Sequence, residues 1–200
     1  MSRYVYQYFR GSLPIRVAGV FFVSFLLFSF YFFLGTFTST DDQFFNIRFA
    51  EILRHDGFSV FQRFDWFAFT PPYPWVSNFL FYVFLVPFTF IAPLEFGIKL
   101  YAVLALAFTL AALYFFLVTV RVRYALWGTA FVLALLFSWP ILWHLLMGRA
   151  FVILPALLLL ELAFLVRGRL VAAGGVSFFY FFWHTGTFFF PWLVAGAYFL

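Results

Sequence analysis

The chain contains no cysteine and very little charge. Only 10% of its 200 residues are Asp, Glu, Lys or Arg. The absence of thiols excludes disulfide bonds, Cys-ligated zinc and Cys nucleophiles, and leaves the redox compartment open. Twelve basic and seven acidic side chains are too few to cover a globular protein of this length in water. An ordinary soluble domain is therefore excluded.

Apolar and aromatic residues make up most of the chain. Hydrophobic residues account for 66% of it, aromatic residues for 28%, and 38 residues are Phe. This composition predicts an integral membrane protein surrounded by lipid. The net charge of +5 does not indicate a nucleic-acid partner, because the basic residues stand singly or in pairs between apolar runs. At such positions they are typical topology signals.

The first apolar run, residues 17–37, is long enough to cross a hydrocarbon layer of roughly 30 Å. A cleaved signal peptide is the alternative, but its apolar region would be shorter. Three arginines precede the run: Arg3, Arg10 and Arg16. By the positive-inside rule they place residues 1–16 in the cytoplasm and residues 38–97 on the outer face. A bacterial or archaeal plasma membrane is the expected location.

Residues 38–97 form an acidic outer loop. Five of the seven acids of the chain lie in its first part, residues 38–75: Asp41, Asp42, Glu51, Asp56 and Asp65. Thr40 and Gln43 fit a capping box and Gly57 fits a helix stop, so a surface helix is expected over residues 41–56. Helical spacing puts Phe45, Phe49 and Ile52 on its apolar face and Arg48, Glu51 and His55 on its polar face.

Residues 76–94 are apolar but contain Asn78, Pro87 and Pro93, so a re-entrant or broken helical segment is expected there. If this segment does not cross the membrane, later spans over residues 98–120, 125–143 and 151–166 leave two arginine pairs inside. These pairs are Arg121 with Arg123, and Arg167 with Arg169. Arg149 then lies outside, and the charges agree with the positive-inside rule.

The expected fold class is therefore all-α: a polytopic transmembrane helix bundle with an amphipathic helix in its outer loop. Residues 1–200 are treated as one transmembrane domain, with residues 98–200 as the main helix bundle. The final apolar segment ends without a polar residue, so the chain is expected to be the N-terminal portion of a longer protein. Such a portion is expected to be inactive alone.

The segment "DQFFNIR", Asp42 to Arg48, resembles the D-x-W-F-N-x-R segment in the first outer loop of oligosaccharyltransferase catalytic subunits. The order of a first span, an acidic outer loop, a proline-rich turn and a bundle of spans is similar to that of the GT-C superfamily. This superfamily of membrane glycosyltransferases includes protein mannosyltransferases, aminoarabinose transferases and Rgt-like sugar transferases. The resemblance covers most of the chain as architecture and a short segment as a motif.

This resemblance implies a catalytic role for Asp42, with Asp41 as its neighbour, and a sugar donor linked to polyprenyl phosphate. The acceptor, a glycan, a lipid or a protein, stays open. The next outer loop, "WHLLMGRAF", has no acid. The pattern therefore favours metal-independent relatives without a cofactor, and Asp42 is the metal ligand if a divalent cation is used. A structural alternative is that both acids complement a helix dipole.

Arg149 and His144 are the candidates for binding the donor phosphate, on the grounds of placement and charge. Alternatively, Arg149 marks a helix boundary and reaches the lipid headgroups, and His144 is a packing residue. Two other function classes stay open. A polytopic transporter or lipid flippase would also bury occasional charges such as Glu161. A noncatalytic membrane scaffold would leave the acidic loop without a chemical task.

Overall fold

The computed structural model describes residues 3–34, 41–59, 78–137, 149–183 and 189–199. Over these ranges the chain forms α-helices and short 3-10 helices, and no strand. The all-α class expected from the sequence is confirmed.

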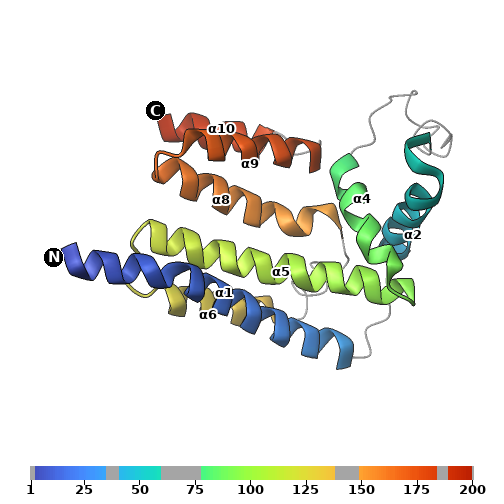
Figure 1. Cartoon of the computed structure of the whole chain (residues 1–200), viewed down its shortest axis with the longest axis horizontal. Helices are drawn as coiled ribbons and strands as arrows, with labels where there is room; N and C mark the ends of the chain where they lie inside the picture. Colours follow the sequence, from blue (N-terminus) through green and yellow to red (C-terminus); the bar gives the residue numbers. More distant parts are fainter. Residues whose placement is uncertain (1–2, 35–40, 60–77, 138–148, 184–188, 200) are drawn as a thin grey trace.

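Six helices lie side by side in a bundle (Figure 1). They are α1 (Arg3–Leu34), α5 (Leu94–Thr119), α6 (Ala125–Leu136), α8 (Leu154–Val166), α9 (Leu170–Trp183) and α10 (Phe189–Phe199). The 3-10 helix η4 (Ala150–Ile153) leads into α8. Helix α5 is central, because it contacts α1, α6 and α8, while α9 and α10 pack on α8. The chain runs back and forth along the bundle (Figure 1).

Small residues allow α5 to occupy the centre. Its buried side chains include Ala102, Ala105, Ala107, Ala111 and Ala112, and small side chains let neighbouring helices approach closely. The closest approach is at Gly97, where an added Cβ would lie 2.2 Å from the carbonyl oxygen of Phe88. Only glycine fits at this contact.

Two helices cross one end of the bundle (Figure 1). They are α2 (Asp41–Asp56), followed by η1 (Gly57–Ser59), and α4 (Phe79–Leu85), followed by η3 (Val86–Phe90). Helix α2 has the range expected from the capping pattern, and Gly57 follows it with a φ of +64°, as is common after a helix. It packs against α4, η3 and α5. We call this assembly the outer cap, after the outer loop to which the sequence analysis assigned these residues.

The observed helices differ from the expected boundaries in α1, α5 and α6, the last of which ends at Leu136 instead of residue 143. Helix α1 begins at Arg3 and includes Pro14, so most of the expected cytoplasmic segment, residues 1–16, continues the first apolar run as helix. A helix can continue through proline where neighbouring groups satisfy the freed carbonyl. Helix α5 begins at Leu94, directly after Pro93, whose fixed φ is compatible with a helix start.

Two of the described helical stretches, Ser12–Phe33 and Leu94–Thr119, are long and apolar enough to cross a membrane. The apolar helices α6, Ala150–Val166 and α9 are shorter. Large apolar side chains point outward along the bundle, among them Phe30, which is 69% exposed, and Trp127, which is 75% exposed. An apolar surface of this extent is unfavourable in water and favourable in lipid.

Candidate functional site at the outer cap

Helix α2 is docked on the bundle through one face. The buried side chains of that face are Gln43, Ile47, Phe49, Ala50 and Leu53. The sequence placed Phe45 on one face with Phe49, and the two rings stack at 6.3 Å between centroids, while Phe45 is 47% exposed. The rotation of α2 about its axis places its buried face against α4, η3 and α5.

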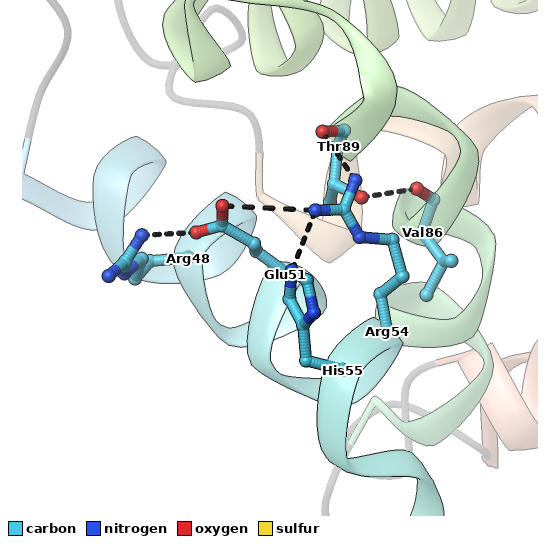
Figure 2. A network of polar contacts seen from close by, with 6 residues as sticks. All are labelled: Arg48, Glu51, Arg54, His55, Val86 and Thr89. Atoms are coloured by element: carbon cyan, nitrogen blue, oxygen red, sulfur yellow. Dashed lines mark hydrogen bonds and ion pairs between the residues drawn. The ribbon is translucent and has the colours of Figure 1, made fainter.

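Arg54 connects α2 to η3 (Figure 2). Its guanidinium donates a 3.0 Å hydrogen bond to the carbonyl oxygen of Thr89 and lies 4.7 Å from the ring centroid of Phe90. The same group lies 2.8 Å from Nε2 of His55 and 4.0 Å from Oε1 of Glu51. Arg54 therefore has a structural role that holds the helix in place.

Arg48, the last residue of the motif, forms an ion pair with Glu51 on the same helix (Figure 2). The Arg48 side chain is 64% exposed. An exposed pair of this kind contributes little to stability, about 0 to 1 kcal/mol. The polar face expected for Arg48, Glu51 and His55 is therefore present as a hydrogen-bonded network.

The motif residue Asn46 contacts α4. Its Oδ1 accepts a hydrogen bond from the hydroxyl of Tyr82 at 3.4 Å, and the Tyr82 ring lies 4.5 Å from that of Phe49, centroid to centroid. The outer cap buries Tyr82, and desolvation raises its pKa from 10.0 to about 12, because the phenolate would lose its hydration. The phenol is therefore neutral at ordinary pH and acts as a donor.

The backbone around Arg149 is held by buried aromatic side chains. The Tyr101 hydroxyl donates to the carbonyl oxygen of Arg149 at 3.4 Å, and the Trp183 indole donates to that of Ala150 at 2.8 Å. Tyr101 and Trp183 are 1% and 0% exposed. The Arg149 guanidinium lies 5.8 Å from the ring centroid of Phe151. Helices α5 and α9 thus fix the start of η4.

A continuous aromatic cluster connects α2 to the Arg149 segment. Phe81 of α4 lies 5.2 Å from Tyr82, 5.5 Å from Tyr101 and 6.0 Å from Trp183 between ring centroids. Because Tyr82 contacts α2 and Tyr101 contacts Arg149, both belong to the same end of the bundle. Figure 1 shows the start of α8 and helices α2 and α4 at that end.

The acidic candidates are located only by their backbone. Helix α2 begins at Asp41, so Asp41 and Asp42 lie in its first turn. Their side chains lie outside what the structure describes, as does the whole of His144. Within the described ranges, no group of three or more His, Asp or Glu side chains is arranged to hold a metal ion.

Three residues that carry polar groups are buried: Lys99, Trp183 and Glu161. Lys99 is only 9% exposed and lies within the second turn of α5. Trp183 was not singled out, although a tryptophan in an apolar run often brings an N–H group that needs a partner. Glu161 is 1% exposed, with Oε1 accepting a 2.9 Å hydrogen bond from Ser177. Its Oε2 has no partner among the described residues.

Comparisons of the chain with protein-family models, with curated proteins and with solved structures find no match. Function is therefore inferred from the geometry and chemistry of the chain itself.

Proposed function

We propose that the chain belongs to a multi-pass membrane glycosyltransferase of the GT-C type, which transfers a sugar from a polyprenyl-phosphate donor on the outer face of the membrane. The observation that carries this proposal is the shared location of α2 and Arg149. The aromatic cluster around Phe81 connects the helix that begins at Asp41 to the segment that presents Arg149. An acid and a cation at one end of a bundle suit a sugar phosphate.

The distribution of arginines supports a multi-pass topology. Arg121 and Arg123 lie in the turn between α5 and α6, and Arg167 and Arg169 lie in the turn between α8 and α9. Both turns are at the end of the bundle opposite the outer cap (Figure 1). The positive-inside rule assigns that end to the cytoplasm. The segment Ala150–Val166 has 17 residues, the lower limit of about 17 for a span.

The proposed reaction is a displacement at the anomeric carbon of the donor sugar. An acceptor hydroxyl or amide forms a bond to this carbon as the bond to the phosphate oxygen breaks. The Asp42 carboxylate takes the acceptor's proton, and the bonding electron pair leaves with the polyprenyl phosphate. Arg149 compensates the charge that accumulates on the phosphate. A general base of this kind contributes roughly 10² to 10⁴ in rate.

The test uses membranes that contain the full protein and polyprenyl-phosphate hexoses labelled in the sugar. Asp42→Asn keeps the size of the side chain and removes the base, so transfer of label from the donor lipid is expected to fall roughly 10²-fold or more. Asp56→Asn, at the exposed end of α2, is the matched control and should retain transfer. Equal rates for Asp42→Asn and the unmodified protein at equal protein levels would contradict the proposal.

Glu161 favours transport as a second candidate function. It is an acid buried between α8 and α9, with one carboxyl oxygen unpaired among the described residues. An acid inside a span commonly serves a proton or substrate pathway. A transporter should lose uptake on Glu161→Gln and keep it on Asp42→Asn. A glycosyltransferase should lose sugar transfer on Asp42→Asn and keep it on Glu161→Gln.

A further inference from the structure

A large groove opens at the end of the bundle opposite the outer cap. It has a volume of about 2440 Å³ and is lined by the middle of α1, the second half of α5, the first half of α6 and the end of α8. Pockets for drug-sized ligands are roughly 300 to 1,000 Å³. The groove is therefore large enough for a ligand with a long chain.

Beyond the groove, toward the outer cap, the second half of α1 contacts Phe137, which follows α6. The ring of Phe137 lies 5.4 Å from that of Phe28 and 5.3 Å from that of Tyr31, centroid to centroid. Toward the other end the facing walls are apolar, with Val17 and Phe21 on α1 and Ala130 and Leu133 on α6. These walls suit an acyl chain that lies between α1 and α6.

Five arginines from three separate parts of the chain line the groove. They are Arg16, Arg121, Arg123, Arg167 and Arg169. None of the described lining residues is acidic. Two of the guanidinium groups lie against aromatic rings, Arg167 at 4.3 Å from the ring centroid of Phe115 and Arg123 at 5.3 Å from that of Tyr124. In this arrangement each guanidinium covers the face of an aromatic ring and keeps its positive charge, which can attract an anion.

Aromatic residues mark the depth of the groove mouth. Tyr124 and Trp127 line it and are 61% and 75% exposed. Exposed Tyr and Trp side chains are typical of the level of the lipid headgroups. In the proposed topology this end faces the cytoplasm, where the leaflet carries anionic lipids. The mouth of the groove is therefore positively charged, lies at the level of the lipid headgroups in the proposed topology, and adjoins the apolar walls.

We propose that this groove binds an anionic phospholipid of the cytoplasmic leaflet. The arginines at the mouth bind its phosphate through charge-assisted hydrogen bonds, and one acyl chain lies between α1 and α6. If these arginines only set the topology, they would not need to line one groove, and the groove would not need apolar walls. This site is separate from the transferase site at the outer cap.

The test measures lipid retention by the purified full chain in neutral detergent, using native mass spectrometry with added phosphatidylglycerol or phosphatidylcholine. We expect phosphatidylglycerol to be retained preferentially. The variant Arg121→Gln/Arg123→Gln should weaken its binding about tenfold or more. Arg48→Gln removes one positive charge from α2, at the end of the bundle opposite the groove (Figure 1). It should change binding less than about twofold, since the interaction of exposed charges is screened over about 10 Å. Melting temperatures identify any variant that fails to fold.

Two further measurements separate a lipid from a free anion. Ala130→Trp fills part of the apolar wall without changing charge, so it should weaken phosphatidylglycerol binding while the arginines are intact. Inorganic phosphate at millimolar concentration should not displace the lipid. The proposal is overturned if phosphatidylcholine binds equally well, if Ala130→Trp and the arginine variant both retain phosphatidylglycerol fully, or if inorganic phosphate displaces it.

Discussion

The indole Nε1 of Trp183 donates a 2.8 Å hydrogen bond to the carbonyl oxygen of Ala150. The neighbouring carbonyl, that of Arg149, accepts from the hydroxyl of Tyr101 at 3.4 Å. Two consecutive backbone acceptors at the start of η4 are therefore satisfied by buried aromatic side chains from α9 and α5. Their positions fix where Arg149 enters the end of the bundle that α2 and α4 cross.

Replacing Trp183 with phenylalanine should loosen this segment. Trp183→Phe keeps an aromatic ring but leaves the Ala150 carbonyl without its donor, which should cost about 1 to 3 kcal/mol. A lower midpoint of thermal unfolding in detergent would be the readout. Trp192→Phe, at a position that is 68% exposed, is the control and should change the midpoint little. An unchanged midpoint for Trp183→Phe would show that this hydrogen bond has no structural role.

The contact between α5 and η3 should be sensitive to a single methyl group. A Cβ at residue 97 would lie 2.2 Å from the carbonyl oxygen of Phe88, so Gly97→Ala should destabilise the protein by about 1 to 3 kcal/mol. At Gly174 a Cβ would meet nothing within 4 Å. Gly174→Ala should therefore stabilise helix α9 by up to about 1 kcal/mol. Equal shifts of the unfolding midpoint in the two variants would contradict this packing.

The hydrogen bond between Glu161 and Ser177 should show coupling in a double-mutant cycle. Ser177→Ala removes the described partner of a buried carboxyl and should cost about 1 to 3 kcal/mol. In the double variant Glu161→Leu/Ser177→Ala both polar groups are absent, so the loss of stability should be smaller. Additive losses, measured by unfolding in detergent, would show that the two side chains do not interact.

Alkaline pH should weaken the outer cap through Tyr82, which lies outside the proposed spans. Its pKa is about 12 in the folded protein against 10.0 for the free side chain. Stability is therefore complete below pH 10 and is lost as the pH rises toward 12, by about 2 to 3 kcal/mol from this group. Tyr82→Phe lacks the ionisable group and should show a weaker loss over that range. Parallel pH profiles for both proteins would contradict burial of the hydroxyl.

The sequence was sufficient for the kind of fold and for several boundaries. Composition indicated an all-helical chain, and the expected helix over residues 41–56 has the bounds of α2, Asp41–Asp56. These features depend on local signals: apolar runs, a capping pattern and a glycine stop. The rotation of α2 about its own axis could not be predicted from local sequence signals. Phe45 is half-exposed while Ile47 and Leu53 are buried, because α4, η3 and α5 select the face that is covered.

The contacts that hold the Arg149 segment also could not be predicted from the sequence. Tyr101 and Arg149 are 48 residues apart, and Trp183 and Ala150 are 33 apart. Periodicity within one helix carries no information about such partners. Arg149 was chosen from the charge pattern, but its connection to α2 through Phe81 became visible only in the assembled structure. The five arginines that line the groove lie in three separate segments of the sequence, where each segment was interpreted only as a topology signal.

The central claim is that the start of α2 and Arg149 share the outer face of the membrane. The chain has no cysteine, so single cysteines can be introduced without further changes and labelled in intact cells with a membrane-impermeant maleimide. We predict that Asp42→Cys and Arg149→Cys react from outside, and that Arg123→Cys reacts only after permeabilisation. Labelling of Asp42→Cys and Arg149→Cys from opposite sides would contradict the account.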